Sequence, residues 1–284
     1  MIVKRHFTVE GAGLGLRRAF LDSLATVPDV AVDFYEVAPE NWIKFGGRLG
    51  KQFRALSERF PFVSHGLSLS IGSPAPLDEA FILEIKKFLS LHRIRKYSEH
   101  LSYCSDDGHL YDLMPIPFTE EAVEYVTGRI RRVQDMLEQR IAIENVSYYA
   151  APGKEMEEID FLNAVLAQAD CELLLDINNI YVNSVNHGYD AEAFLAAISA
   201  DRIAYAHIAG HYVEAQDLIV DTHGAEVISP VWTLLEKAYR LHGVFPTLLE
   251  RDFNIPSLPE LVDEVQMIRS IQTDTMSEPN VRYG

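Results

Sequence analysis

Residues 202–224, RIAYAHIAGHYVEAQDLIVDTHG, are the stretch from which the fold of this chain can be argued. Its first part, Ile203 to Ile208, is mostly apolar, as expected of a strand that is buried on both faces in a parallel sheet. Gly210 lacks a side chain and permits a sharp turn directly after this run. The stretch therefore predicts a buried strand that ends abruptly in a loop.

The same stretch carries potential metal ligands. His207 and His211 lie where the predicted strand ends, and Asp221 and His223 lie further along the loop. Asp221 and His223 are two residues apart, so both side chains would point the same way in an extended segment. If these residues bind a metal, other strands are expected to supply the remaining ligands.

Strand and helix patterns alternate along the whole chain. The strand candidates are residues 10–17, 30–36, 62–69, 96–104, 140–147, 172–180, 203–208 and 245–252. The helix candidates that follow them are residues 18–26, 48–59, 78–92, 119–139, 156–169, 190–200, 230–241 and 258–271. Such alternation favours an α/β fold with a parallel sheet, and eight units fit a (β/α)8 TIM barrel of about 250 residues. A doubly wound open sheet is the alternative.

No linker or low-complexity segment divides the chain, so residues 1–284 are expected to form a single domain. The barrel is expected over about residues 8–271, followed by a peripheral tail at 272–284. Residues 10–17, EGAGLGLR, do not have the GxGxxG spacing of a phosphate loop. Glycines there favour a first barrel strand with close backbone packing.

Composition excludes several classes of function. The chain has 25 basic and 42 acidic residues, a net charge of −17, which disfavours binding to nucleic acid. Residues 1–20 lack a signal-peptide pattern, and no apolar run approaches the roughly 18 residues of a membrane span. Two cysteines, Cys104 and Cys171, are too few for a disulfide scaffold and fit a reducing compartment. We therefore expect a cytoplasmic protein without a membrane partner.

Acids and imidazoles recur at the ends of the predicted strands. His65, His100, Glu144, Asp176, His207 and Glu250 each lie within or at the end of a different strand candidate, and His211, Asp221 and His223 lie in one loop. In a barrel of this type the carboxyl ends of the strands meet on one face. Several carboxylates brought together there would be unfavourable without protons or cations, so the pattern predicts a metal site.

Each of these residues also has a purely structural interpretation. A histidine in a strand, such as His65, is by itself more often a core or surface residue than a ligand, and Glu144 with Asn145 could form a turn or cap. The recurrence at otherwise apolar strand ends favours the metal site, because burial there without partners is costly. The other histidines, His6, His92, His109, His187 and His242, are expected at the surface. Cys104 is expected to be a small buried residue.

The identity of the metal is less constrained by the residues. Imidazole and carboxylate ligands without thiolate admit iron, manganese or zinc and disfavour a structural zinc site. Nine candidates exceed the number that one ion needs, so two or three ions are expected. Glu36, Asn145 and Asn178 lie on the same rim and are weaker candidates that could orient ligands or water. The predicted chemistry is metal-centred, and no separate catalytic side chain is assigned.

Seven ordered motifs carry a resemblance to a known family. They are HGLSL at His65, SEHLSY at residues 98–103, IENVS at 143–147, LDINN at 175–179, HIAGH at 207–211, DTHG at 221–224 and LLERD at 248–252. Over about residues 8–270 the chain resembles the multinuclear non-haem iron-dependent oxidative enzymes, formerly a family of unknown function, which include the oxidase of methanobactin biosynthesis.

The resemblance implies a barrel enzyme that holds two or three irons as Fe²⁺ and Fe³⁺. Such enzymes use dioxygen to modify residues, often cysteines, in ribosomally made precursor peptides. It implies that the nine candidates at the strand ends and in the loop are the iron ligands. It also implies a partner protein that captures the leader of the precursor peptide. The reaction itself is not fixed by the resemblance, because members that share these ligands form different products.

Two other classes of function remain open on the sequence. A metal-dependent hydrolase or isomerase with the same barrel, similar to endonuclease IV or to sugar isomerases, would also gather His, Asp and Glu at strand ends. A metal-storage or metal-dependent assembly protein would use the site to stabilise a complex. Bound zinc or manganese without oxygen consumption would favour the hydrolase or isomerase. Tight partner binding without a redox change of the metals would favour the storage or assembly protein.

Overall fold

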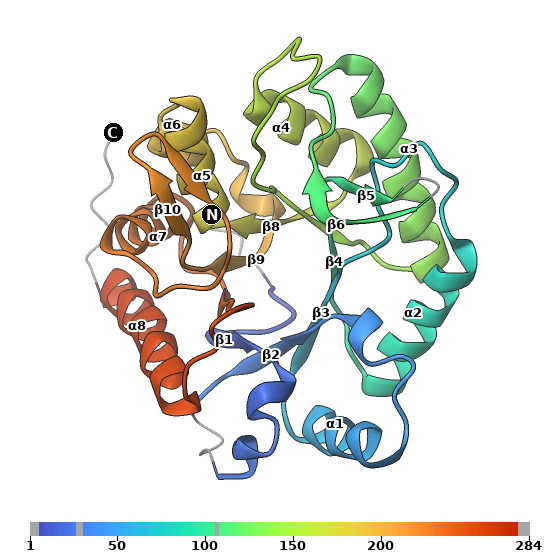
Figure 1. The fold of residues 1–284 in the computed structure, drawn as a ribbon, viewed down its shortest axis with the longest axis vertical. Coiled ribbons are helices and arrows are strands. Elements are labelled where there is room, and N and C mark those ends of the chain that lie inside the picture. The colour runs from blue at the N-terminus through green and yellow to red at the C-terminus, as the bar shows by residue number, and fades with distance from the viewer. Residues whose placement is uncertain (1–5, 27–30, 106–107, 278–284) are drawn as a thin grey trace.

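The structure is a closed barrel of eight parallel strands, which confirms the predicted TIM barrel and excludes the open sheet. It is a computed structural model that describes residues 6–26, 31–105 and 108–277. Around the barrel the strands follow the order β1-β12-β9-β8-β7-β4-β3-β2 (Figure 1). They are β1 (Ala12–Gly15), β2 (Phe34–Val37), β3 (Phe62–Gly66), β4 (Tyr97–His100), β7 (Ala142–Glu144), β8 (Glu172–Asp176), β9 (Ile203–Ile208) and β12 (Thr247–Leu249).

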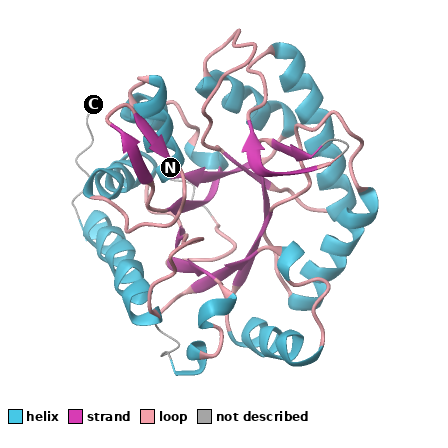
Figure 2. Cartoon of the chain, viewed as in Figure 1, coloured by secondary structure: helices cyan, strands magenta, loops and turns pink. Residues whose placement is uncertain are grey.

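Helices surround the barrel on its outer face, as Figure 2 shows. They are α1 (Gly47–Arg59), α2 (Glu79–His92), α3 (Glu120–Leu137), α4 (Glu158–Ala169), α5 (Ile177–His187), α6 (Ala191–Ala196), α7 (Ser229–His242) and α8 (Leu258–Ser277). Short 3-10 turns lie at Arg18–Phe20, Ser23–Thr26, Pro39–Asn41 and Ala200–Arg202. Within the described residues, no helix combines the length and apolarity that crossing a lipid bilayer requires.

The barrel interior is filled by its own side chains. A cluster separate from the main core consists of Val9, Phe34, Val63, Ala142, Leu174, Tyr205 and Leu248. A Cβ on Gly13 would lie 2.5 Å from the Phe34 ring, so the glycine makes room for this aromatic side chain. The predicted closely packed first strand is therefore confirmed, although β1 covers only Ala12–Gly15 of the expected residues 10–17. This packed layer lies inside the barrel, next to the strand ends that line the candidate site.

The strand register brings the predicted ligands to one level. His100 pairs with Glu144 between β4 and β7, and Asp176 pairs with His207 between β8 and β9. Parallel strands in register deliver residues at equal depth to the same rim of the barrel. The side chains at these positions can therefore face one another across the opening.

Two hairpins at the rim were not predicted. The first joins β5 (Tyr103–Ser105) to β6 (His109–Met114), and the second joins β10 (Tyr212–Ala215) to β11 (Leu218–Val220). The predicted strand 96–104 is in fact two strands, because the chain leaves the barrel after His100. Cys104, in β5, is buried as expected.

Several helical segments differ from the prediction. Residues 18–26 form two 3-10 turns, since a segment this short gains few α-helical hydrogen bonds. Residues 177–180 begin α5 instead of ending a strand. The backbone N–H of Asn179 donates to Asp176 Oδ1 at 2.6 Å, so Asp176 caps the helix. The helix predicted at 190–200 is shorter, with α6 ending at Ala196.

The C-terminal helix is longer than predicted. α8 continues to Ser277, so residues 272–277 belong to the helix and not to the expected tail. Residues 278–284 lie outside the described residues. Gln272 is buried, and its side-chain amide donates to the carbonyl of Gly11 at 3.1 Å and to that of Phe245 at 3.2 Å. The helix persists because this polar residue ties it to the N-terminal end of the barrel.

Two histidines expected at the surface are buried. His92 lies between α1 and α2, where its Nδ1 is 2.9 Å from the Ser57 hydroxyl. His242 ends α7, and its Nε2 is 2.8 Å from the Leu195 carbonyl. The expectation was wrong because a hydrogen-bonded imidazole can complete a helix interface. His6 and His187 are exposed as expected, and the side chain of His109 lies outside the described residues.

Candidate metal centre

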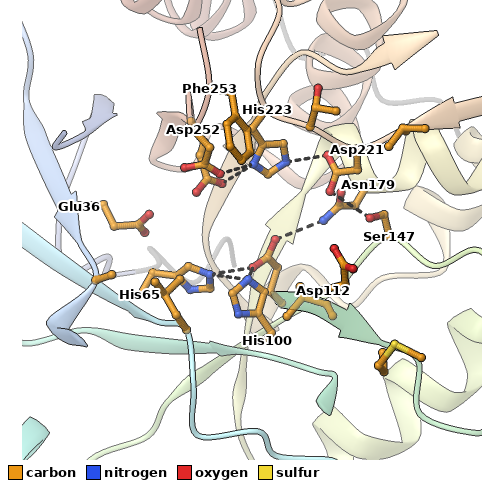
Figure 3. Close-up of a pocket in the computed structure, with 18 of the residues that line it drawn as sticks. Glu36, His65, His100, Asp112, Ser147, Asn179, Asp221, His223, Asp252 and Phe253 are labelled. Carbon is orange, nitrogen blue, oxygen red and sulfur yellow. Dashed lines mark hydrogen bonds and ion pairs between the residues drawn. The ribbon is translucent and has the colours of Figure 1, made fainter. Parts of the chain in front are cut away.

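A cavity of about 950 Å³ opens at the carboxyl ends of the barrel strands. Figure 3 shows the polar side chains that converge on it from several strands and loops. Of the predicted ligands, its lining includes His65, His100, Glu144, Asp221, His223 and Glu250, together with Glu36. Asp176 and His207 are fully buried next to Glu144 and Glu250. The structure thus brings together residues that are far apart in the sequence, from Glu36 to Glu250.

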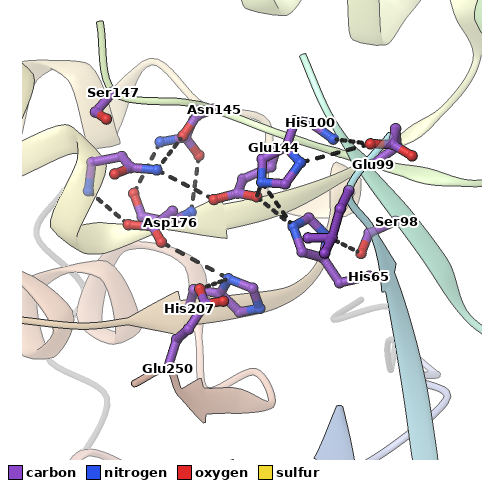
Figure 4. A network of polar contacts seen from close by, with 12 residues as sticks. His65, Ser98, Glu99, His100, Glu144, Asn145, Ser147, Asp176, His207 and Glu250 are labelled. Atoms are coloured by element: carbon purple, nitrogen blue, oxygen red, sulfur yellow. Dashed lines mark hydrogen bonds and ion pairs between the residues drawn. The ribbon is translucent and has the colours of Figure 1, made fainter. Parts of the chain in front are cut away.

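The first cluster joins β3, β4 and β7. His65 Nε2 lies 3.0 Å from Glu144 Oε2 and 3.1 Å from His100 Nε2. His100 Nε2 lies 3.5 Å from the same Glu144 oxygen. Three ligand atoms therefore face one common point (Figure 4), as the donors of a single cation would.

The second cluster is centred on His207. Its Nε2 lies 3.0 Å from Glu36 Oε2, and its Nδ1 lies 2.9 Å from Glu250 Oε2 and 3.9 Å from Asp176 Oδ2. His207 and Asp176 are completely buried, and Glu36 is 3% exposed. Glu36, predicted only as a weaker candidate, is thus placed as centrally as the other carboxylates.

The third cluster contains the Asp-Thr-His triplet of the loop after β11. His223 Nε2 lies 2.8 Å from Asp221 Oδ1, and its Nδ1 lies 3.2 Å from Glu250 Oε2. The two side chains meet, although not through an extended backbone, because His223 has a left-handed φ of 47°. Asp176 joins His223 and Glu250 as a possible ligand group.

The remaining predicted residues contact these clusters. His211 Nδ1 is 2.8 Å from Asn178 Oδ1, and the Asn178 amide donates to Asp221 at 2.8 Å. Asn145 exchanges two hydrogen bonds of 2.9 Å with the backbone of Asp176. Asn145 therefore restrains the backbone of Asp176, and Asn178 lies between His211 and Asp221. His211 is buried beside them, with 4% of its surface exposed. None of the four possible ligand groups found among the described residues includes it.

The donor atoms fit bound cations better than they fit one another. Six buried atoms of the candidate ligands make no hydrogen bond among the described residues, although all but the last of them lie within 4 Å of an oppositely charged atom: His100 Nδ1, Glu144 Oε2, Asp176 Oδ2, His207 Nδ1, His223 Nε2 and His211 Nε2. Buried polar atoms are seldom left unpaired, because desolvation then goes uncompensated. Imidazole and carboxylate without thiolate suit iron, zinc or manganese. The observed arrangement therefore offers buried donor atoms without hydrogen bonds, and these are of the types that bind metals.

Charge coupling inside the first cluster is strong. Burial by itself would raise the pKa of Glu144, but His100 and His65 lower it to about 2. Burial would lower the pKa of His100, yet Glu144 and Glu99 raise it to about 9. The carboxylate is thus held ionised, and without a cation the imidazoles would have to carry the compensating positive charge.

The other clusters show the same competition. Burial raises the pKa of Asp176 well above its ordinary value, and the charge of Glu144 adds to this effect. Burial opposes protonation of His207, but Glu36 and Glu250 raise its pKa well above the ordinary value. The pKa of His223 is raised in the same way by Asp221 and Glu250 against burial. Among the described residues, the ligand groups gather four carboxylates beside four imidazoles. Multivalent cations would balance the buried negative charge.

Sequence reasoning missed several side chains that complete the site. They are Arg17, Glu99, Asn179 and Asp252. Arg17 Nη2 pairs with Asp252 and lies 3.4 Å from Glu250 Oε1, so it restrains one oxygen of a predicted ligand. Glu99 and Asp252 each stand within two residues of a predicted ligand, which is a usable signal. Arg17 ends the first strand candidate, and nothing in its local sequence indicates a contact with Glu250.

A comparison with protein families matches residues 11–273 to the model described as RiPP precursor modification enzyme MbnB/TglH/ChrH, RiPP being a ribosomally synthesised and post-translationally modified peptide. A UPF0276 protein of Shewanella sediminis is 63% identical over 260 residues, which cover 92% of this chain and 94% of that protein. A UPF0276 protein of Alcanivorax borkumensis is 61% identical over 280 residues, covering 95% and 94%.

Solved structures with the same fold are more distant in sequence. The 3-keto-D-glucoside 4-epimerase of E. coli superposes with a TM-score of 0.62 at 12% identity, covering 91% of this chain and 98% of that one. The IOLI protein with a bound zinc atom gives a TM-score of 0.60 at 13% identity, covering 94% and 98%. These likenesses support the barrel alone. The family match over nearly the whole barrel confirms the resemblance of the motifs, and the chain belongs to the family of RiPP precursor modification enzymes.

Proposed function

We propose that this protein is a multinuclear non-haem iron oxidase that uses dioxygen to modify residues, in the first place cysteines, of a ribosomally made precursor peptide. The observation that supports it best is that the ligand groups share members. Glu144, Asp176, His207 and Glu250 each belong to two of the four groups. Carboxylates and imidazoles shared in this way suit two or three ions placed side by side, which is the arrangement of a multinuclear centre.

The proposal assigns the metal ligands by residue. They are His65, His100, Glu144, Asp176, His207, His211, Asp221, His223 and Glu250, with Glu36 added by its contact with His207. The donor types admit iron without requiring it, and the choice of iron rests on the family resemblance. Bound iron would supply the electrons and the Lewis acidity needed to activate dioxygen.

The chain itself would bind and orient the peptide. The cavity of about 950 Å³ is large enough for a few residues of a peptide segment. Trp42, Tyr149 and Phe253 line its wall and offer apolar contact beside the polar ligand groups. Arg17 and Asp252 pair at the same wall and hold Glu250 in place. We expect these residues to position the reacting side chain and to limit the access of water.

A leader-binding partner protein is part of the proposal, and so is a cytoplasmic location. The net charge of −17 suits a basic segment on the partner or on the precursor peptide. Pull-down of a short cysteine-containing peptide together with a second protein from the producing cells, lost at high salt, would support this assignment. Modification of the peptide by the isolated chain alone would contradict the need for a partner.

Metal analysis of anaerobically purified protein tests the central claim. We expect two or three irons per chain by elemental mass spectrometry, with mixed oxidation states in the Mössbauer spectrum of an iron-57 sample. Stoichiometric zinc or manganese with negligible iron, persisting after expression in iron-supplemented medium, would contradict the proposal. It would favour the metal-dependent hydrolase or isomerase instead.

Matched histidine variants test the assignment of the ligands. His207 belongs to two ligand groups, so His207→Gln should lower the iron content by more than His100→Gln, which touches one group. His92→Gln is the control, because His92 is also buried but bonds to Ser57 between α1 and α2. Equal iron contents for the His207 and His92 variants, with circular dichroism showing that both are folded, would reject the assigned centre.

A further inference from the structure

The hairpin of β10 and β11 has one open strand edge. β11 packs on α5, and its residue Ile219 is buried. β10 is exposed at every position, and no third strand of the described residues pairs with it. Proteins usually protect such an edge with charges, proline or a covering segment, because its N–H and C=O groups can pair with another chain. Here Glu214 is the one charge, and Tyr212 and Val213 are apolar side chains that are 55% and 61% exposed.

The register shows which backbone groups face this open edge. The Asn186 side-chain amide donates to the Ile219 carbonyl at 2.9 Å, and the Ile219 N–H donates to Asn186 Oδ1 at 2.8 Å. Both backbone groups of Ile219 therefore point away from β10. Val213 lies opposite Ile219 in the antiparallel pair. Two opposite residues either exchange both hydrogen bonds or point both groups outward. Val213 therefore directs its N–H and C=O to the open edge.

The open edge begins at the candidate metal centre. β10 starts directly after His211, and Tyr212 pairs with Val220, which lines the cavity. Asp221 follows Val220 and lines the cavity as well. An extended segment rises about 3.3 Å per residue, so one that pairs along β10 reaches the cavity rim at the Tyr212 end. The residues that continue such a segment past Tyr212 would enter the cavity.

Charge distinguishes between possible occupants of the edge. Glu214 lies in β10 and Asp217 lies in the turn that follows it, in a chain with a net charge of −17. A second copy of the chain would bring the same acids to a shared edge, and like charges across a strand pair are unfavourable. A segment with basic residues would be attracted instead. The edge therefore suits a basic, extended peptide better than another copy.

We propose that β10 is a docking edge on which an extended segment of the precursor peptide pairs with the backbone of Val213, so that the residues next to it reach the cavity. In this mode of recognition, main-chain hydrogen bonds supply the affinity and exposed side chains such as Tyr212 contact alternate residues of the peptide. The identity of the peptide as a precursor rests on the proposed function, whereas the pairing itself does not.

A synthetic peptide tests the pairing in the full-length chain. The probe alternates valine with threonine, has a lysine at either end and carries one cysteine. With ¹⁵N-valine labelling, the probe should shift the Val213 amide signal and slow its hydrogen exchange. The same peptide with N-methyl groups on its valines and threonines lacks the backbone donors and should bind about 10 times more weakly. Equal binding of both peptides, or no binding of either at millimolar concentration, would overturn the proposal.

Substitutions of Val213 separate its backbone from its side chain. Val213→Pro removes the outward N–H and leaves the bonds to β11 in place, because an edge strand tolerates proline where the N–H faces solvent. We expect the probe to bind this variant about 5 to 10 times more weakly. Val213→Ala, the control, keeps the N–H and should lose much less. Equal affinities for the two variants would reject backbone pairing, provided that the signals of the other valines show both to be folded.

Sedimentation velocity tests the other occupant. A dimer of the unmodified chain that becomes a monomer in Val213→Pro would assign the edge to a second copy and overturn the proposal. Iron analysis keeps this inference apart from the proposed function. If the chain holds no iron but the probe pairs at Val213, the oxidase proposal fails and the peptide edge stands. If the chain holds iron and the probe does not pair there, the docking edge is rejected.

Discussion

Glu158 shows that single buried acids also occur away from the cavity. It lies in the first turn of α4 and is 8% exposed, and its Oε1 accepts from the Asn183 side-chain amide at 3.3 Å. Burial raises the pKa of its carboxyl group to about 7, although nearby hydroxyl and amide groups oppose the change. The folded protein therefore takes up a proton here that the unfolded chain, with a pKa near 4.5, releases.

We predict that this residue makes stability depend on pH. Because the pKa is higher in the folded state, the stabilisation is complete below pH 4.5, declines as the pH rises and is lost above pH 7. Glu158→Gln should remove this dependence. Between pH 5 and pH 8 the unmodified chain should lose about 2 to 3 kcal/mol more free energy of unfolding than the variant. Urea denaturation at both pH values measures the difference, and parallel losses would contradict it.

At the level of single residues, the sequence predicted residues that line the cavity better than the residues that support them. His65, Glu144 and Glu250 were recognisable because a polar residue ends an otherwise apolar strand. Ser98 and Tyr205 gave no comparable signal, since a serine or tyrosine inside a strand reads as ordinary packing. Their hydroxyls lie 2.7 Å apart inside the barrel although β8 and β7 separate their strands, and no local pattern contains that information.

The turn after β9 depends on one glycine. A Cβ on Gly210 would lie 2.1 Å from the Ala225 carbonyl oxygen and 2.4 Å from that of Glu226. Both contacts are with backbone, so neither neighbour can move aside by changing a rotamer. The backbone of residues 225–226 thus packs directly on the residue that precedes His211.

We predict that Gly210→Ala destabilises the protein by roughly 1 to 3 kcal/mol and displaces His211, because one of the two segments must shift. Gly128→Ala is the control. Gly128 lies within α3, and nothing is found within 4 Å of its added Cβ, so alanine there should stabilise by about 0.5 to 1 kcal/mol. Guanidinium denaturation of both variants checks the opposite signs. Equal effects would show that the contacts at Gly210 relax freely.

Elements of the barrel were predictable where the spacing of apolar residues in the sequence matches the burial of the element. β9 is buried along nearly its whole length and was placed correctly from its apolar run. β10 is exposed at every position and has no alternating pattern, so its hairpin could not be inferred. The start of α5 was hidden for another reason: Asp176 ends a strand and caps a helix at once.

At the scale of the whole molecule, four buried carboxylates of the described residues gather at one end of the barrel. Glu36, Glu144, Asp176 and Glu250 all lie within the ligand groups. Their mutual repulsion opposes folding unless positive charge is held among them. Metal binding should therefore contribute to global stability as well as to chemistry.

We predict that removing metal with a chelator lowers the thermal midpoint by about 5 °C or more, and that added Fe²⁺ at 100 times its Kd restores it. Differential scanning calorimetry under anaerobic conditions measures the shift. His207→Gln should show a much smaller response, since His207 belongs to two ligand groups. A midpoint that is independent of metal in the unmodified chain would mean that the clusters do not bind it in the folded state.

The pairing of β1 with β12 joins the two ends of the barrel sequence, with Ala12 opposite Thr247. During synthesis on the ribosome, Glu36 and His207 emerge long before Glu250, which directly follows β12. The group formed by these three residues is therefore incomplete until translation of the barrel is almost finished. A nascent chain lacks this complete group of side chains, so any ion that bound there would be acquired only once the barrel is finished.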